Sequence, residues 1–222
     1  MTIYQSINSS CFMFPVGISV SGTARVGHHL GSGDVKAARL SGLVCIVGTG
    51  LFSISLGSML YLTPHEYFPS LFTSDVKLIE MTRQVIPLLS IYVIADGLQM
   101  SMNAIIKGCG RQLILIPIVI VSYWLIAVPL SYHLAFVRSG GTTDCDEQAS
   151  FCGVVGLVGG LTVGTWTHFI LLAIYCTYMI DWQLEADLAT ERLSLEKRTG
   201  YNEEVRDDIS LSDVVPVKAL DI

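Results

Sequence analysis

Long apolar stretches separated by short polar segments form the main pattern over the first 180 positions of the chain. Five of these stretches contain almost no charge, at about residues 6–24, 40–63, 84–106, 112–137 and 154–180. A helix needs about 20 predominantly apolar residues to cross the hydrocarbon core of a membrane. Four stretches exceed that length, and the first, which is rich in serine and glycine, nearly reaches it. The pattern therefore predicts an all-α fold, a polytopic transmembrane helix bundle of five spans.

The composition agrees with a membrane-embedded body. Apolar residues make up 51% of the chain and charged residues only 14%, against about 25% charged residues in soluble domains. The mean hydropathy is +0.58. So few charges cannot cover the surface of a soluble globule, which argues against a cytosolic enzyme and a secreted disulfide scaffold. The net charge of −6 argues against binding to nucleic acid.

The charges are unevenly divided along the chain. The first 181 residues hold 17 of the 32 charged residues, and the last 41 residues hold the other 15. We therefore divide the chain into a membrane body at residues 1–181 and an acidic tail at residues 182–222. In the tail, residues 183–198 have the leucine spacing of a short amphipathic helix, and we expect disorder beyond it.

Basic residues near the ends of the spans predict the orientation in the membrane. Five of them place the first loop, the third loop and the tail on the cytoplasmic side: Arg25, Lys36, Arg39, Lys107 and Arg111. Three lie on the opposite side: Lys77, Arg83 and Arg138. The amino terminus and residues 139–152 would then face outward.

Asp96 is the one charged residue deep within a predicted span. At about 100° per residue, helical spacing puts Tyr92, Gln99 and Asn103 on the same face as Asp96. An ionised carboxylate at that depth costs about 2.5–3.5 kcal/mol, so it needs a partner or a proton. We interpret this polar stripe as a site facing a wet cavity, where a cation or proton neutralises Asp96. The alternative is a structural carboxylate that is hydrogen-bonded to a neighbouring helix.

The remaining candidate residues, cysteines and histidines, give weaker evidence for a functional site. Cys145 and Cys152 bracket a polar segment on the predicted outer side, so they are a candidate disulfide, with free thiols as the alternative. His133 and His168 lie in or near spans, where each either lines a pathway or makes a packing hydrogen bond. No metal-binding or catalytic motif is present in the sequence, so we expect neither an enzyme nor a bound metal.

Glycines crowd the start of the fifth span. Gly156 and Gly160 form a GxxxG pattern, which allows two membrane helices to approach closely. We expect a packing role for these glycines and no nucleotide site.

Several short motifs follow one another in a fixed order. They are Pro15-Val16-Gly17-Ile18-Ser19, Arg25-Val26-Gly27, Leu30-Gly31-Ser32-Gly33, Lys36-Ala37-Ala38, Lys107-Gly108-Cys109-Gly110-Arg111-Gln112, Tyr123 with Val128-Pro129-Leu130, Gly153-Val154-Val155-Gly156-Leu157 and Asp181-Trp182. In this order and spacing they resemble the multidrug and toxin extrusion (MATE) transporters of the eukaryotic type. The resemblance covers nearly the whole body, from the eighth to the twelfth helix of such a transporter. The sequence departs from the family at Lys107, usually Arg, and at Val158, usually Trp.

The resemblance implies that residues 1–181 are part of a carboxy-terminal transmembrane lobe, with a cytoplasmic tail and without the first seven helices. It implies secondary active export of organic cations and xenobiotics in exchange for protons, at the plasma membrane, driven by a proton gradient and without a cofactor. Asp96 matches the acidic tenth-helix position implicated in cation and proton coupling, and Tyr92, Gln99 and Asn103 would shape the substrate pocket.

The expected partners are the lipid bilayer, organic cations, protons and an amino-terminal lobe, with no nucleic acid. The main alternative is a truncated, transport-incompetent membrane protein or an incomplete gene model. A subunit that acts only by association and a pore-forming channel are further alternatives.

Overall fold

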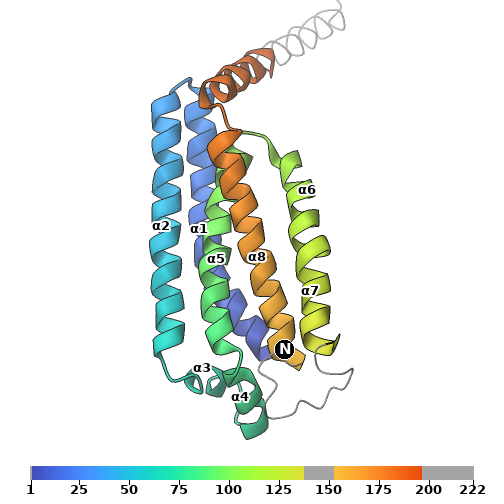
Figure 1. The fold of residues 1–222 in the computed structure, drawn as a ribbon. Helices are drawn as coiled ribbons and strands as arrows, with labels where there is room; N and C mark the ends of the chain where they lie inside the picture. The colour runs from blue at the N-terminus through green and yellow to red at the C-terminus, as the bar shows by residue number, and fades with distance from the viewer. Residues whose placement is uncertain (1, 138–152, 197–222) are drawn as a thin grey trace, which may run out of the picture.

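One helix, α5 (Ile86–Gly108), lies at the centre of the bundle. The computed structural model describes residues 2–137 and 153–196, and its long helices run nearly side by side (Figure 1). Around α5 pack α1 (Thr2–Gly31), α2 (Val35–Leu62) and α8 (Gly153–Tyr178). In the most apolar 18-residue window of α5, 72% of the residues are buried. In the corresponding window of the segment 112–137, only 11% are buried. Neighbouring helices therefore shield α5, whereas the segment 112–137 presents most of its surface outward.

The segment 112–137 is helical throughout but irregular. In order, it consists of η1 (Gln112–Ile114), α6 (Leu115–Val119), the π-helical η2 (Ile120–Ala127), α7 (Val128–Tyr132) and the π-helical η3 (His133–Val137). Pro117 and Pro129 lie within it. Because proline cannot donate the regular backbone hydrogen bond and crowds the preceding turn, we attribute η1 to Pro117, which follows it, and η2 to Pro129, which follows it.

The predicted all-α membrane bundle is confirmed. In the described part of the chain, four helices are long and apolar enough to cross a membrane, and they match the second to fifth predicted spans: α2, α5, the segment 112–137 and α8. The first predicted span, 6–24, lies inside α1, which is less apolar although its 30 residues extend about 45 Å. Large apolar side chains such as Leu51 and Trp124 are 64% and 69% exposed, as expected for surfaces that face lipid.

The first loop is shorter than the sequence pattern indicated. The first charged residue after the apolar stretch, Arg25, does not mark the end of α1. The helix continues to Gly31, so Arg25 lies in the helix and not in a loop. The turn to α2 contains Gly33, whose φ of +76° favours glycine. It ends at Asp34, whose carboxylate accepts a hydrogen bond from the backbone N–H of Ala37 at 3.0 Å and so caps α2.

Two short helices follow α2, where the sequence pattern indicated only a loop. They are α3 (Tyr67–Ser70) and α4 (Val76–Arg83). Asp75 caps α4 through the backbone N–H of Lys77 at 2.9 Å. Arg83 links the two helices, because its Nη1 lies 2.7 Å from Glu66 Oε1 and 3.4 Å from Glu80 Oε2.

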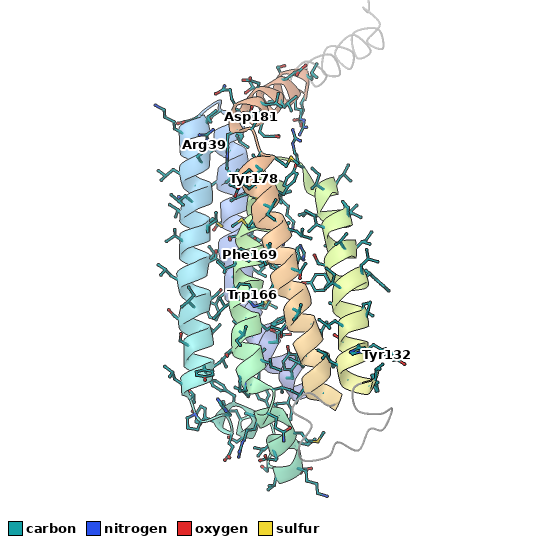
Figure 2. The ribbon with its side chains drawn as sticks, viewed as in Figure 1. Arg39, Tyr132, Trp166, Phe169, Tyr178 and Asp181 are labelled. Atoms are coloured by element: carbon teal, nitrogen blue, oxygen red, sulfur yellow. The ribbon has the colours of Figure 1, made fainter. Side chains whose placement is uncertain are left out.

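A further helix at residues 182–196 follows α8, close to the amphipathic segment expected in the tail. It lies at the end of the bundle that carries Arg39 and Asp181, opposite Tyr132 (Figure 2). We call this end the Arg39 end. Asp181 Oδ1 accepts the backbone N–H of Gln183 at 3.0 Å, and Ala186 belongs to the same apolar cluster as Ile106 and Leu172. The start of the tail therefore packs against the membrane body.

Candidate functional site

The polar stripe predicted on α5 is buried at the centre of the bundle. Asp96, Gln99 and Asn103 are 6%, 4% and 8% exposed, and Tyr92 is half-buried. The neighbouring Gly97 lets α2 approach closely, since a side chain there would overlap Ser53. The helix packing thus removes the carboxylate of Asp96 from the outer surface.

A short hydrogen bond joins two of the predicted site residues. Gln99 Nε2 donates to Asp96 Oδ1 at 2.6 Å. Among the described residues, no basic side chain forms an ion pair with Asp96. A neutral amide is therefore the group that the structure places against this carboxylate.

The hydrogen-bonded chain continues onto two other helices. The Tyr123 hydroxyl, from η2, donates to Gln99 Oε1 at 3.4 Å and lies 3.4 Å from Thr165 Oγ1 of α8. Three elements that are distant in sequence therefore meet around Asp96.

Two further tyrosines lie near the carboxylate. Tyr92 of α5 and Tyr4 of α1 are both close enough to Asp96 for an electrostatic interaction. Asn103 lies one helical turn beyond Gln99, and its Oδ1 is buried with no hydrogen-bond partner among the described residues. The structure thus brings Tyr92 and Gln99 to Asp96, and leaves the carbonyl oxygen of Asn103 unsatisfied.

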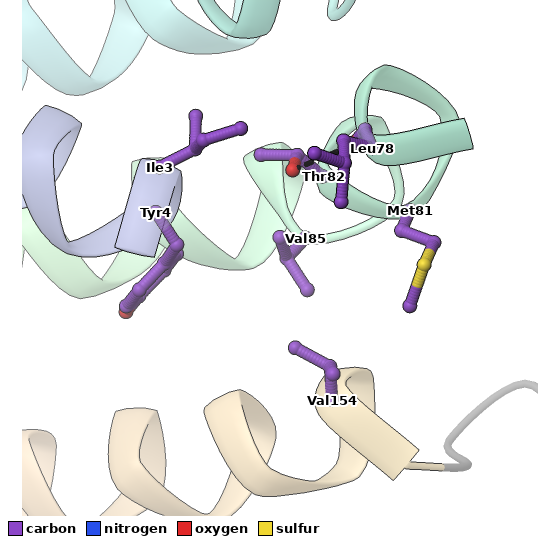
Figure 3. Close-up of a pocket in the computed structure, with 7 residues that line it drawn as sticks. All are labelled: Ile3, Tyr4, Leu78, Met81, Thr82, Val85 and Val154. Atoms are coloured by element: carbon purple, nitrogen blue, oxygen red, sulfur yellow. Dashed lines mark hydrogen bonds between the residues drawn. The ribbon is translucent and has the colours of Figure 1, made fainter. Parts of the chain in front are cut away.

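A small cavity lies at the end of the bundle opposite the Arg39 end. It has a volume of about 140 Å³ and apolar walls, with Tyr4 and Thr82 as its polar members. Figure 3 shows Ile3 and Tyr4 of α1 on one side, Leu78 and Met81 of α4 on the other, and Val154 of α8 on a third. Tyr4 lines this cavity and is also close enough to Asp96 for an electrostatic interaction, so it lies between the two regions.

The sequence pattern missed Tyr123 and Thr165 as site residues. Tyr123 is half-buried beside the exposed Trp124, and the mostly apolar segment 112–137 has no periodicity that gives its direction. Its place in the motif with Val128-Pro129-Leu130 was the available signal. Thr165 follows the glycine-rich start of α8, where Gly160 and Gly164 pack directly against Ser131 and Ala127. The small residues on this face were the available signal, because they bring α8 against η2.

The cysteines add no site within the described residues. Cys145 and Cys152, the candidate disulfide, lie outside the described residues. Four other cysteines are free thiols: Cys11, Cys45, Cys109 and Cys176. The described residues also contain no cluster of three or more metal-ligating side chains.

At the Arg39 end, a second buried carboxylate has a different partner. The side chain of Glu185, in the helix at 182–196, is 1% exposed and forms an ion pair with Arg111 Nε. Partial burial tends to lower the pKa of Arg111, but its contacts with Tyr175 and Glu185 raise it overall, so the guanidinium stays charged. Nearby, burial and the Glu185 carboxylate raise the pKa of the Cys109 thiol to about 12.

Comparison with known proteins gives one consistent family. The model of the MatE family matches residues 1–133. Protein DETOXIFICATION 14 of Arabidopsis thaliana is 28% identical over 194 residues, which are 87% of this chain and 37% of that protein. Human multidrug and toxin extrusion protein 1 is 29% identical over 154 residues, 69% of this chain and 25% of that protein.

The fold matches a solved structure as well. The crystal structure of the eukaryotic MATE transporter AtDTX14 superposes with a TM-score of 0.75 at 28% identity, over 86% of this chain and 40% of that one. The chain therefore spans two fifths or less of the length of these relatives. Since the family model covers more than half of its residues, this chain belongs to the MatE family of multi-pass membrane transporters.

Proposed function

We propose that the chain is part of an exporter that exchanges organic cations for protons across the plasma membrane. In this proposal residues 1–181 contribute to the carboxy-terminal lobe, and the tail at 182–222 is cytoplasmic. Asp96 holds either a proton or a cation, and Tyr92, Gln99 and Asn103 shape the pocket around it. No cofactor takes part, because the proton gradient supplies the driving force.

One observation carries the proposal: the Asp96 carboxylate is buried against a neutral amide, without a basic partner among the described residues. Burying an ionised carboxylate in a membrane costs about 2.5–3.5 kcal/mol even on insertion scales. A hydrogen bond from Gln99 stabilises the anion but does not neutralise its charge. A proton or an organic cation would supply that neutralisation.

A single carboxylate also couples the two ions by competition. A proton on Asp96 removes the negative charge that attracts an organic cation, and a bound cation lowers the affinity of the carboxylate for a proton. The two ions then occupy the site alternately, which is the requirement for exchange. The relatives named above for detoxification and for multidrug and toxin extrusion support export of drugs and toxins.

The test is uptake of a fluorescent organic cation into proteoliposomes under an imposed pH gradient. We expect Asp96→Asn to reduce gradient-driven uptake at least about tenfold, because the amide cannot bind a proton in this way. The matched control is Asp187→Asn, which changes an exposed aspartate on the helix at 182–196 and should leave uptake unchanged.

Two outcomes would count against the proposal. Undiminished exchange in Asp96→Asn would remove Asp96 from the mechanism. A wild-type chain that carries no cation under the gradient would instead support the alternative of a membrane protein without transport activity of its own.

A further inference from the structure

A buried histidine, His168, lies against Tyr123, at the end of the hydrogen-bonded chain that runs from Asp96 through Gln99 to Tyr123. His168 of α8 is 4% exposed, and neither of its ring nitrogens has a hydrogen-bond partner among the described residues. Leaving a buried polar group unsatisfied costs about 1–3 kcal/mol. Most buried polar side chains have partners, so an imidazole with two unsatisfied nitrogens indicates a group that receives its partner from elsewhere.

Close packing of α8 positions this imidazole. Gly160 and Gly164 bring α8 against the segment 112–137, and the ring of His168 then lies edge-on to Tyr123, with centroids 5.3 Å apart at 82°. Trp166 and Phe169, its neighbours in sequence, lie near mid-height of α8 (Figure 2). The imidazole is therefore at the depth of the membrane core, away from both ends of the bundle.

Tyr123 connects the histidine to the carboxylate. Its hydroxyl is within hydrogen-bonding distance of Gln99 and Thr165, and it makes no hydrogen bond to the imidazole of His168. Through Tyr123 and Gln99, the site has two chemically different ends. Asp96 attracts any positive charge, whereas a neutral imidazole offers one N–H donor and one nitrogen acceptor.

We propose that His168 is a specificity-determining residue, which accepts a hydrogen bond from an N–H group of the transported cation. The inference rests on the proposed function, because it assigns a substrate class to the same site. Cations with N–H groups, such as protonated amines and guanidiniums, use both ends of the site. Quaternary ammonium ions have no N–H group and use the Asp96 end alone.

The size of the effect follows from the cost of an unmade hydrogen bond. Sites that hydrogen-bond a ligand reject analogues without the matching group, because the polar group of the site is then buried unpaired. Loss of one hydrogen bond to a charged group weakens binding by about 10- to 100-fold. Replacing His168 should therefore affect one class of cation and spare the other.

The experiment compares two aromatic cations of similar size, phenylguanidinium and phenyltrimethylammonium. Their binding to the purified full chain in detergent is measured by equilibrium dialysis at pH 8, where an ordinary imidazole is neutral. We expect His168→Leu to weaken phenylguanidinium binding about 10- to 100-fold and to change phenyltrimethylammonium binding less than about twofold. His168→Gln, which keeps a donor and an acceptor, should restore most of the loss.

The matched control is His133→Leu. His133, the other histidine placed near a span by the sequence pattern, is exposed at the start of η3, so its replacement should leave the ratio of the two affinities unchanged. Circular dichroism of each variant checks that the helical content is retained.

The outcomes separate the two proposals. Equal weakening of both cations in His168→Leu, or no weakening of either, overturns the role of His168 and leaves the Asp96 proposal standing. Failure of the wild-type chain to bind either cation overturns both proposals. Selective weakening without proton-driven uptake upholds the role of His168 in binding and supports the alternative of a chain without transport activity of its own.

Discussion

The described residues contain two buried carboxylates, and their surroundings are opposite. Asp96 lies mid-bundle on α5 and accepts a hydrogen bond from the neutral side chain of Gln99. Glu185 lies at the Arg39 end and is paired with the guanidinium of Arg111. A paired buried charge holds two elements together, whereas an unpaired one is costly unless another ion neutralises it. The same functional group thus serves packing in one region and, by our proposal, transport in the other.

Breaking the Arg111–Glu185 pair gives the largest expected loss of stability. Glu185→Leu leaves Arg111 partly buried without its anion, and we expect the free energy of unfolding to fall by about 3 kcal/mol. The double variant Arg111→Met with Glu185→Leu should recover most of this loss, because apolar pairs often replace buried ion pairs without cost. Thermal unfolding in detergent, followed by circular dichroism, measures both. A double variant as unstable as the single one would show that the pair is not the cause.

The close contact between α8 and the segment 112–137 is the next test, because it holds Tyr123 and Thr165 near the Asp96 site. Gly164→Leu would place a side chain into Ala127 and the backbone at Ser122. We expect a loss of about 2 kcal/mol from overpacking, together with weakened cation binding. The matched control is Gly17→Leu, since, apart from its own helical turn, no atom of the described residues lies within 4 Å of a Cβ atom at that position. Leucine has a higher helix propensity than glycine, so the substitution should not by itself destabilise either helix. Equal loss in both variants would therefore show that the contact with Ala127 is not the cause.

Neutralising Asp96 should not lower the free energy of unfolding, whereas breaking the Arg111–Glu185 pair should. Asp96→Asn removes a buried negative charge that forms no ion pair with a basic side chain of the described residues, and the amide can still pair with Gln99. We expect the stability to be unchanged or to rise by about 1 kcal/mol. The measurement is again thermal unfolding at neutral pH. A loss of 2 kcal/mol or more would mean that the carboxylate serves packing, which was the alternative considered for the α5 stripe.

The parts of this fold that the sequence predicted are those set by local composition. Apolar length located four spans, and helical periodicity put Asp96 and Gln99 on one face, where they do form a hydrogen bond. Neither inference requires knowledge of how helices pack. The exact helix ends were less predictable, because α1 continues past Arg25 until Gly33 and Asp34 make the turn.

The parts that the sequence did not predict depend on contacts between distant segments. Tyr123 and Thr165 reach the site only after η2 and α8 pack together, 42 positions apart in sequence. Arg111 and Glu185 are even further apart in sequence, and no periodic pattern relates them. In a membrane body, where most side chains are apolar on every face, such pairings leave little trace in the sequence.

The smallest expected effect concerns Cys109, which reports on the electrostatics of the Arg111–Glu185 pair. Only the thiolate reacts with maleimide, so a pKa of about 12 makes Cys109 slow to react at pH 8. Glu185 raises this pKa and Arg111 lowers it. Glu185→Gln should therefore speed the reaction of Cys109 about threefold, and Arg111→Gln should slow it by a similar factor, relative to wild type. The rates are measured by mass spectrometry in a background where Cys109 is the only cysteine.

Both variants break the same pair, so if loosening of the helix at 182–196 controlled access, both would react faster. Opposite changes in rate identify charge as the cause.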